Sequence, residues 1–583
     1  MPTMVVQMSS PFETRAQFHS ICTLFNIATF HMTTSTPILI VGAGPAGLVL
    51  ALSLLQNGVP VRIIDKAPEY HVGRRGRGIQ PRTLEVFHML GALPEILASS
   101  SEDHVTRVYK LPGGTEIVKE FTRTNPADPT PATPYPNPRS LGQEQTEAIL
   151  RDHLSKYNGR VELNTELLSF EQYPDRVSAR IAKHADGVDT EETVDCHYLV
   201  GTDGGKGIVR KQLGLSFLGE TREDQHIVVA DLQLKGIDHH FGHQWGDVAT
   251  KFCSLRPPEN DDYWTLLGAG QIDHAKIVAD RDELIAFVRA VTDRDDIEVG
   301  HVKWISEFRP NIRMVDKFGE GRVFVAGDAA HVHPPTGGQG LNSSVQDSFN
   351  LGWKLALVEK GLATPALLET YTEERLPVIA EMLKKSTDLL NKTVARASST
   401  AASARGGALR QLGVNYRWSP IVVDEGAEAE GVSGQPVAAY GDASGVLHAG
   451  DRAPDATGLH KIKGPEMVDT DTSLFRIFGS SHHTALVFAT SAEEANAALG
   501  SLAEYPTEVI RAVLVLPAGA PLPAVDAEVV LEDRDGHAYA GYGAKQGRLT
   551  IAIVRPDGYV GALVHGAQGV ENYFDRIFAC LTA

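Results

Sequence analysis

The stretch "PILIVGAGPAGLVLALSLLQNGVPVRIIDK" (residues 37–66) decides the fold of this chain. It reads as a buried strand, a tight turn of glycines, an apolar helix and a second strand that ends at Asp65. Gly42 permits the tight turn, Gly44 lets the backbone approach a pyrophosphate, and Gly47 lets the helix pack close to the strand. The pattern predicts a βαβ unit with a dinucleotide at the helix N-terminus, and it does not distinguish FAD from NAD.

The size and charge of the chain narrow the function classes. It has 583 residues, of which 42% are hydrophobic, and its formal net charge is -19. A chain of this length predicts two or three domains. Because it carries no dense basic cluster, nucleic acid is not an expected partner. The four cysteines stand far apart without a CxxC pair, which indicates reduced thiols and a cytoplasmic protein.

The first residues carry no clear targeting pattern. The apolar stretch "ICTLFNIATF" (residues 21–30) is too short to cross a bilayer, so we expect no stable membrane insertion. Residues 1–35 are interpreted as a disordered or dispensable leader, with a weak organelle transit signal as the alternative.

Periodicity along the chain indicates further organisation. Helical and strand patterns alternate from residue 36 to about 395, around a Pro-rich surface loop at 125–138. Period-2 runs within residues 215–310 predict an inserted antiparallel sheet. A long helical pattern then grades into a connector at 396–439, and a new α/β pattern at 440–583 predicts a separate small domain.

Two more stretches place polar residues at the ends of predicted strands. "YLVGTDGGKGIVRKQLGL" (residues 198–215) contains Asp203 and Arg210 in a strand-turn-helix corner, where an ordinary surface corner is the alternative reading. "GDAAHVHPPTGGQGLNSSVQDSFNLGWKLA" (residues 327–356) follows a buried strand and places Asp328 at its carboxyl end. Ligands of open α/β sheets gather at that edge, so both stretches are candidate parts of one site.

These stretches together resemble the FAD-dependent aromatic hydroxylases of the phenol hydroxylase and 2,4-dichlorophenol monooxygenase family. "RGRGIQPRTLEVF" (residues 75–87) and "LGQEQTEAILRDHL" (residues 141–154) are similar to two further family blocks. The resemblance implies an α/β fold with an FAD-binding, Rossmann-like domain of the p-hydroxybenzoate hydroxylase type at 36–214 and 311–395. It also implies that the sheet at 215–310 binds substrate.

The C-terminal part resembles the thioredoxin-like domain of the same family. "GDRAPDA" (residues 450–456) and "IVRPDGYVGA" (residues 553–562) carry this likeness. Because the domain has no CxxC pair, thiol redox chemistry is not expected there. The resemblance implies a structural or dimer-forming role, and hence a homodimer.

The resemblance assigns cofactor roles to residues of this sequence. FAD would be held by the first glycine turn, the end of the second strand, two further loops and the start of the helix near Leu341-Asn342. Asp203 and Arg210 match a second family motif, which is implicated in binding both FAD and NADPH. A Gly stands at 207 where that motif usually has Ser, and this departure weakens the inference for NADPH. The implied cofactor-binding residues are Gly42, Gly44, Pro45, Ala46, Gly47, Asp65, Lys66, Arg75, Gln143, Asp203, Arg210, Asp328, Gly338, Gly340, Leu341 and Asn342.

The family chemistry implies that NADPH or NADH reduces FAD, that O2 adds at the flavin C4a carbon, and that the hydroperoxide passes oxygen to a phenolic ring. This oxygen transfer is compatible with two reactions: hydroxylation at a free ortho carbon, and decarboxylative ipso hydroxylation of a 4-hydroxybenzoate-type ring. Arg77 could stabilise a phenolate or a carboxylate but cannot act as a base. Tyr263 and Trp264 align loosely with a family active-site strand, and Pro335 would exclude water.

Some features stay open at this point. His331 and His333 have no assigned role, and no metal site is expected because no Cys accompanies them. An epoxidase or another oxygenase of a non-aromatic substrate could use the same flavin scaffold. A flavin-binding redox sensor without turnover is the alternative from a different functional class.

Overall fold

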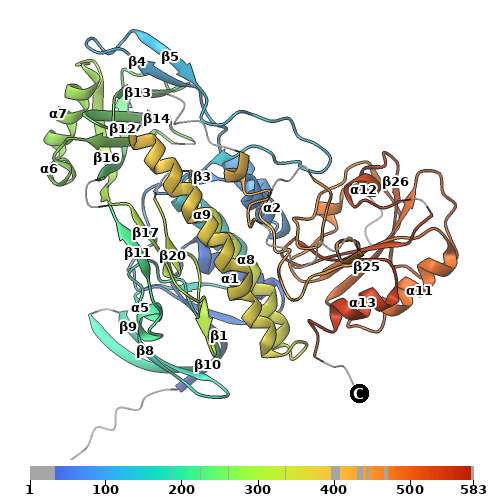
Figure 1. The fold of residues 1–583 in the computed structure, drawn as a ribbon. Coiled ribbons are helices and arrows are strands. Elements are labelled where there is room, and N and C mark those ends of the chain that lie inside the picture. Colours follow the sequence, from blue (N-terminus) through green and yellow to red (C-terminus); the bar gives the residue numbers. More distant parts are fainter. Residues whose placement is uncertain are drawn as a thin grey trace, which may run out of the picture.

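The structure of the protein is a computed structural model. It describes residues 33–185, 187–222, 225–259, 261–334, 337–395, 407–429, 438–441, 445–464, 470–545 and 547–579. Most of the predicted leader, Pro335 and large parts of the predicted connector lie outside these residues. Figure 1 shows a central α/β body, a second sheet at one end of it, and a C-terminal α/β body in orange and red beside it. No helix within the described ranges is long and apolar enough to span a membrane.

The predicted βαβ unit lies at the centre of an eight-stranded sheet. β1 pairs in parallel with β10 on one side and with β2 on the other, and β19 pairs in parallel with β10. The carboxyl ends of β1, β10 and β19 therefore meet at one edge of the sheet. The strands are β1 (Thr33–Val41), β2 (Val61–Ile64), β7 (Val161–Glu162), β8 (Thr165–Gln172), β9 (Val177–Ala185), β10 (Val188–Gly201), β18 (Gly319–Glu320) and β19 (Val323–Val325).

Helices pack on this sheet through apolar faces. α1 begins with Pro45 in its first turn, where a missing N–H costs nothing, and its next residues are buried. α8 lies against α1, and a Cβ added at Gly352 of α8 would sit 2.5 Å from Ser53 Oγ, so glycine permits the close approach. The helices are α1 (Pro45–Gln56), α2 (Pro81–Met89), α3 (Leu93–Ser99), α4 (Gln143–Ser155), α5 (Ile208–Gln212), α8 (Gly340–Glu359) and α9 (Glu369–Ala395), with short turns η1 (Gly327–Ala329) and η2 (Pro365–Leu368).

The predicted inserted sheet is present and extends beyond the predicted insertion. It has seven strands, and β4 and β5 from residues 106–121 pair onto it although they precede residue 215. α6 (His274–Ala279) and α7 (Arg281–Thr292) pack against this sheet. In sheet order its strands are β16 (Glu298–Phe308), β12 (Ile227–Lys235), β15 (Tyr263–Gly270), β14 (Lys251–Arg256), β13 (Gly242–Gly246), β4 (Thr106–Tyr109) and β5 (Ile117–Phe121).

Two small sheets join these bodies. β11 (Leu218–Thr221) falls within the predicted insertion at 215–310 but does not join the seven-stranded sheet. It pairs with β17 (Asn311–Met314), which pairs with β20 (His331–Val332). β3 (Gly78–Ile79) pairs with β6 (Arg139–Ser140).

The C-terminal body is an eight-stranded mixed sheet between two apolar clusters. Its order is β21 (Val423–Asp424), β28 (Val560–Val564), β27 (Thr550–Val554), β24 (His483–Phe488), β25 (Ile510–Pro517), β26 (Val529–Asp533), β22 (Leu459–Lys463) and β23 (Asp471–Thr472). Helices α10 (Glu425–Ala429), α11 (Ala492–Leu502), α12 (His537–Gly541) and α13 (Ala567–Phe574) accompany it, with turns η4 (Gly407–Arg410) and η5 (Leu474–Arg476). The predicted fold class is confirmed.

Candidate cofactor and substrate cavity

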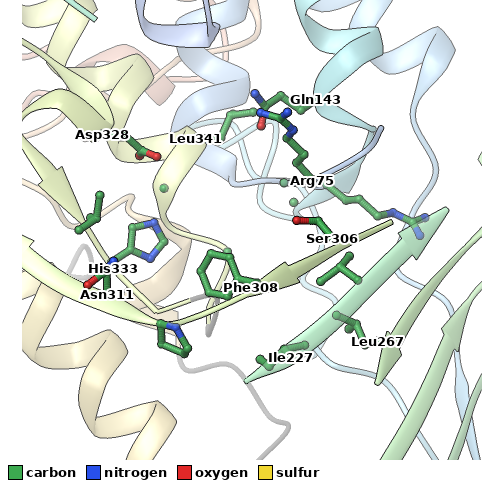
Figure 2. Close-up of a pocket in the computed structure, with 18 of the residues that line it drawn as sticks. Arg75, Gln143, Ile227, Leu267, Ser306, Phe308, Asn311, Asp328, His333 and Leu341 are labelled. Carbon is green, nitrogen blue, oxygen red and sulfur yellow. The ribbon is translucent and has the colours of Figure 1, made fainter. Parts of the chain in front are cut away.

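A single cavity of about 2220 Å³ lies between the central sheet and the seven-stranded sheet. Its lining includes the loops that follow β1, β10 and β19, together with one face of the seven-stranded sheet. Figure 2 shows Asp328 and His333 on one side of the cavity, Arg75 and Gln143 on another, and strand residues such as Phe308 below. A typical ligand pocket has about 300–1,000 Å³, so this cavity has room for more than one ligand.

The glycine turn has the shape that a pyrophosphate requires. Gly42 has φ 106°, and a Cβ there would lie 2.4 Å from Thr202 O, so only glycine fits. Nothing lies within 4 Å of a Cβ placed at Gly44, and no side chain caps the N-terminus of α1 that follows it. Pro45 and Ala46 also line the cavity, whereas Gly47 lies beneath, where a Cβ would be 2.1 Å from Gly42 O. The first turn of α1 therefore offers N–H groups to an anion.

Asp65 fixes this turn and faces the cavity. Its Oδ2 accepts a hydrogen bond from Ala43 N at 2.8 Å, and its Oδ1 accepts one from Ala67 N at 2.9 Å. Each carboxylate oxygen keeps a second lone pair, which suits a ribose hydroxyl. Lys66 lines the same part of the cavity.

The stretch at 327–356 forms the turn η1, the strand β20 and the helix α8. Asp328 is exposed to the cavity, while its neighbours Gly327 and Ala329 are buried. Gly338, Gly340 and Leu341 line the cavity at the start of α8, which no side chain caps. Asn342 does not line it: its Oδ1 accepts from Gln80 N at 2.7 Å, and its Nδ2 donates to Gly78 O at 2.8 Å and to Gly338 O at 2.7 Å. Asn342 therefore holds the loops together.

The two histidines of this stretch have different surroundings. His331 is fully buried, and its Nε2 lies 2.7 Å from Asp347 Oδ2. His333 lines the cavity, with Nδ1 2.6 Å from Pro334 O, and burial lowers its pKa. A Cβ at Gly340 would lie 2.3 Å from His333 Nε2, so the imidazole packs on the start of α8.

Arg75 and Gln143 line the cavity opposite the turn of Asp328. Arg75 has φ 38°, a left-handed conformation that non-glycine residues seldom adopt, and its guanidinium lies 6.0 Å from the ring of Trp304. Gln143 N donates to Arg74 O at 3.0 Å, and its Nε2 donates to Glu147 Oε1 at 2.8 Å. Glu147 of the same helix thus positions the Gln143 side chain, and Trp304 of β16 lies beside the Arg75 guanidinium.

The second motif, at residues 203–210, contributes backbone and one carboxylate to the cavity. Asp203 Oδ2 accepts from Val209 N at 3.0 Å, Asp203 Oδ1 is buried without a partner, and burial raises the pKa of this carboxyl. Arg210 does not line the cavity. Its guanidinium donates to Ala329 O and Gly205 O and lies 3.8 Å from the ring of Phe217.

The face of the seven-stranded sheet supplies a mainly apolar wall. Ile227 and Val229 of β12, Leu267 of β15 and Ser306 and Phe308 of β16 line the cavity from alternating strand positions. Figure 2 shows four of these side chains on adjacent strands. A flat aromatic molecule would pack well on such a wall.

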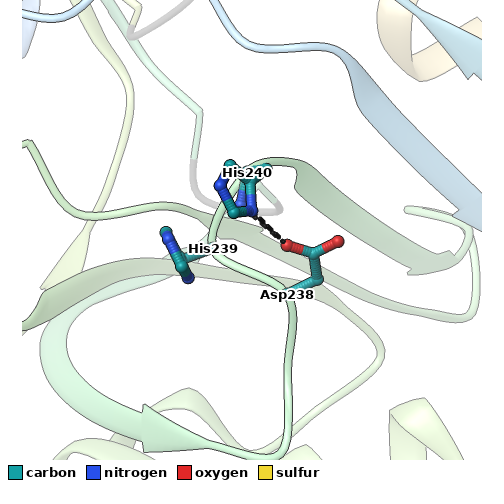
Figure 3. A group of neighbouring side chains, drawn as sticks. All are labelled: Asp238, His239 and His240. Carbon is teal, nitrogen blue, oxygen red and sulfur yellow. Dashed lines mark hydrogen bonds and ion pairs between the residues drawn. The ribbon is translucent and has the colours of Figure 1, made fainter.

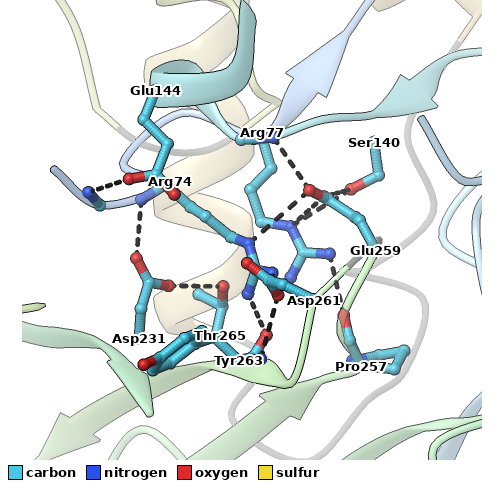
Figure 4. A network of polar contacts seen from close by, with 12 residues as sticks. Arg74, Arg77, Ser140, Glu144, Asp231, Pro257, Glu259, Asp261, Tyr263 and Thr265 are labelled. Atoms are coloured by element: carbon cyan, nitrogen blue, oxygen red, sulfur yellow. Dashed lines mark hydrogen bonds and ion pairs between the residues drawn. The ribbon is translucent and has the colours of Figure 1, made fainter. Parts of the chain in front are cut away.

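A buried network closes the cavity near Arg77 (Figure 4). Arg77 Nε donates to Glu259 Oε1 at 2.8 Å and to Ser140 Oγ at 3.2 Å, and its Nη2 donates to Pro257 O at 3.0 Å. Arg74 contacts Asp261 and the carbonyl of Tyr263, and its backbone N donates to Asp231 Oδ2 at 2.7 Å. Burial lowers the pKa of Arg77, and this network fixes the 73–78 loop to the seven-stranded sheet and the loop before β15.

Tyr263 and Trp264 do not line the cavity. Trp264 is 3% exposed in the core between the sheet and α7, because alternate residues of β15 face opposite sides. Tyr263 Oη lies 3.1 Å from His301 Nδ1 at the surface. Their positions therefore give no support to the catalytic roles predicted for them.

One group of side chains outside the cavity could hold a metal ion. Asp238, His239 and His240 are exposed, and their ligand atoms lie within 4.8 Å of one another (Figure 3). His240 Nδ1 lies 2.9 Å from Asp238 Oδ1, and Arg107 Nη1 lies 3.5 Å from Asp238 Oδ2. The carboxylate already has two partners at the surface, so we assign no metal to this group.

The sequence did not single out Asp347 or Thr202. Thr202 Oγ1 donates to Gly42 O at 2.6 Å behind the glycine turn, and Asp347 lies behind the turn of Asp328. Asp347 belonged to the quoted stretch, and the available signal was that it is the one acidic residue between Leu341 and Val358.

Comparisons with known proteins agree with this geometry. The model of the family "FAD binding domain" matches residues 35–386, and that of "phenol hydroxylase, C-terminal dimerisation domain" matches residues 524–580. A flavin-dependent monooxygenase of Mycobacteroides abscessus is 34% identical over 547 residues, which cover 93% of this chain and 99% of that protein. Pentachlorophenol 4-monooxygenase of Sphingobium chlorophenolicum is 29% identical, covering 92% of this chain and 94% of that protein.

A solved structure shows the same fold. The ternary complex of aklavinone-11 hydroxylase with FAD and aklavinone aligns with a TM-score of 0.74 and 25% identity, covering 93% of this chain and 98% of that chain. The glycine turn, the open start of α1, and the exposed carboxylates of Asp65 and Asp328 fit the same cofactor in this protein.

Proposed function

The chain belongs to the FAD-binding family of flavin-dependent monooxygenases, and from that premise we propose that it uses NADPH or NADH and O2 to hydroxylate a phenolic ring. The observation that carries the proposal is the single cavity lined both by the dinucleotide loops and by the wall of the seven-stranded sheet. When bound, FAD supplies electron transfer from the nicotinamide and the electrophilic oxygen. The protein supplies binding, orientation and exclusion of water.

FAD would be held at three points of the cavity. The first turn of α1, after Gly42 and Gly44, takes the pyrophosphate, and Asp65 accepts from the adenosine ribose. Asp328 accepts from the ribityl chain. The uncapped start of α8 directs N–H groups and a partial positive charge into the cavity, which suits negative charge on the reduced ring.

The dimensions of the cavity favour a phenol with several rings over a single-ring phenol. At about 2220 Å³ the cavity exceeds twice the upper size of an ordinary ligand pocket, so space remains after a cofactor is bound. Ile227, Leu267 and Phe308 offer an apolar wall that excludes water from the reacting ring.

We assign Arg77 to the oxygen of the substrate. Arg77 lines the cavity, and Glu259, Ser140 and Pro257 hold its guanidinium in place. A guanidinium stays protonated at neutral pH even when burial lowers its pKa. It can therefore stabilise a phenolate or a carboxylate, and it cannot remove the phenol proton.

The test is to purify the yellow protein and measure NADPH oxidation and O2 uptake with single-ring phenols, naphthols and hydroxyanthraquinones. A rate stimulated by multi-ring phenols, with a product that gains one oxygen atom, supports the proposal. Gain of oxygen with loss of CO2 from a carboxylated phenol identifies ipso hydroxylation. If no phenol stimulates NADPH oxidation, the proposed function is wrong.

We further propose that the protein is a homodimer that uses its thioredoxin-like body at 440–583, and that it lies on the phenol hydroxylase branch of the family. The match to a dimerisation domain at 524–580 supports this assembly. Sedimentation of the holoenzyme would measure the subunit number directly.

A further inference from the structure

The turn from Gly327 to His331 presents one side chain to the cavity and buries the others. Asp328 is exposed, whereas Gly327, Ala329, Ala330 and His331 are buried. Gly327 has φ 62°, a left-handed form that glycine adopts readily, and Ala330 N donates to Gly327 O at 2.8 Å to close the turn. This local bond sets the shape of the turn, and contacts from outside the turn set its place relative to the cavity.

Asp347 of α8 supplies the first of these contacts. Its Oδ2 accepts from Gly327 N at 3.1 Å and lies 2.7 Å from His331 Nε2, so one oxygen joins both ends of the turn. Its Oδ1 accepts from Arg375 Nε of α9 at 2.7 Å. Burial alone would disfavour the charge, but the Arg375 guanidinium and the neighbouring His331 imidazole hold the pKa of Asp347 below its usual value.

Arg210 of α5 supplies the second contact, from a different element. Its Nη1 donates to Ala329 O at 2.8 Å, which is the carbonyl directly after Asp328. Its Nη2 donates to Gly205 O at 2.7 Å, and its guanidinium lies 3.8 Å from the ring of Phe217. Both Nη atoms of the guanidinium are thus bonded to carbonyls, and the residue is 5% exposed.

The rest of the 203–210 motif lines the cavity on one side and packs against the turn of Asp328 on another. A Cβ at Gly207 would lie 2.1 Å from Asp203 Oδ1, so the carboxylate fills the space of a side chain at 207. From there Asp203 accepts from Val209 N in the first turn of α5. A Cβ at Gly205 would lie 3.1 Å from Val332 Cγ1, so the motif packs directly behind the turn of Asp328.

We propose that Asp347 and Arg210 are positioning residues that hold the turn Gly327–His331 from two elements and so direct Asp328 towards FAD, and that Arg210 is not a ligand of the pyridine nucleotide. The inference rests on the proposed role of Asp328. It differs from the role that the family resemblance implied for Arg210, because the guanidinium points away from the cavity.

The experiment compares the holoenzyme with Asp328→Ala, Asp347→Asn, Arg210→Met and Arg210→Lys. Release of FAD on dilution, followed by flavin fluorescence, gives the FAD Kd of each protein. We expect Asp328→Ala, Asp347→Asn and Arg210→Met each to raise this Kd by about tenfold or more. Arg210→Lys keeps one donor near Ala329 O and should recover part of the affinity.

The KM for NADPH, measured beside the FAD Kd, distinguishes a positioning role of Arg210 from a role as a nucleotide ligand. At saturating FAD, Arg210→Met should leave the KM for NADPH within about twofold of the wild-type value, because no nucleotide contact is lost. Glu374→Gln is the matched control: Glu374 precedes Arg375 on α9 and is equally buried, but it has no contact with the turn. We expect Glu374→Gln to lower the Tm without changing the FAD Kd.

The outcomes test separately the role of Asp328, the positioning role of Asp347 and Arg210, and the absence of a nucleotide contact at Arg210. An unchanged FAD Kd in Asp328→Ala removes the premise, and with it the proposed role of Asp328. A loss in Asp328→Ala with wild-type Kd in both Asp347→Asn and Arg210→Met overturns the positioning role. A tenfold higher KM for NADPH with unchanged FAD Kd in Arg210→Met makes Arg210 a nucleotide ligand. If Asp347→Asn does not fold, Arg210→Met alone decides.

Discussion

Helices α8 and α9 carry two buried charge clusters that differ in what they hold. The flavin-side cluster consists of Asp347, Arg375 and His331, and the C-terminal-side cluster consists of Lys354, Glu374 and Arg555. All six side chains are fully buried, and Glu374 and Arg375 are consecutive on α9. The same two helices thus contact the turn of Asp328 through one cluster and the C-terminal body through the other.

The hydrogen-bond partners of the two carboxylates explain the difference. Asp347 accepts from the backbone N of Gly327, the buried neighbour of the cavity-lining residue Asp328. Glu374 accepts only from side chains: Arg555 at 2.7 and 2.9 Å, Lys354 at 2.8 Å, Asn350 at 2.6 Å and Ser419 at 2.7 Å. A buried ion pair is weak evidence for stability by itself, so its function depends on the segment that it fixes.

Glu374→Gln gives the largest expected effect. It leaves the ammonium of Lys354 buried without a carboxylate and removes one of the two carboxylates that contact Arg555, which keeps Asp557. Breaking a buried pair in this way should lower the free energy of unfolding by about 3–5 kcal/mol. Urea unfolding would measure the loss. The double variant Glu374→Gln, Lys354→Met should recover part of it, because one stranded charge is removed. Equal stability of the single and double variants would contradict this account.

Acid should weaken the C-terminal side through His483. This imidazole is fully buried beside Trp353, neither of its ring nitrogens has a partner, and burial lowers its pKa to about 3. The unfolded chain binds a proton below about pH 6.5 while the native state does not, so stability falls as the pH drops from about 6.5 towards 3.

At pH 5 the loss relative to pH 7 should be about 2 kcal/mol. Urea unfolding across this range measures it. His483→Leu should flatten the acid dependence, since no titrating group remains at that position. An acid dependence identical to that of the wild type would show that other groups cause it.

The sequence predicted much of the fold and part of the site. The 37–66 stretch was sufficient for the βαβ unit because its strand, glycine turn, apolar helix and second strand follow one another directly in the chain. The pairing of β4 with β13 was not predictable, because it joins segments more than a hundred residues apart without a local signal. The direction of Arg210 depends on Phe217 and on the carbonyl of Ala329, so only tertiary contacts reveal it.

Gly207→Ser should have a smaller effect on the flavin side. The new side chain would displace the carboxylate of Asp203, which would lose its hydrogen bond from Val209 N at the start of α5. Loss of a helix cap costs about 1 kcal/mol, and a modest rise in the FAD Kd should accompany it because the motif packs behind the turn of Asp328.

Thermal unfolding and FAD release would measure both effects. Gly500→Ser is the matched control, because nothing lies within 4 Å of a Cβ at that helical position. A Gly207→Ser protein as stable as the wild type, with the same FAD Kd, would mean that Asp203 has room to move without loss.

The smallest effect is expected from the exposed group Asp238, His239 and His240. This group also contains a charge pair, with His240 Nδ1 2.9 Å from Asp238 Oδ1, but water surrounds it. Because solvent screens exposed pairs and neither residue lines the cavity, His240→Gln should change the Tm by less than about 2 °C and leave the FAD Kd unchanged. Differential scanning fluorimetry with and without added Zn²⁺ measures this. A larger fall in Tm would contradict the expectation that an exposed charge pair contributes less to stability than the two buried clusters. A rise in Tm with Zn²⁺ that His240→Gln abolishes would show that this group binds the metal.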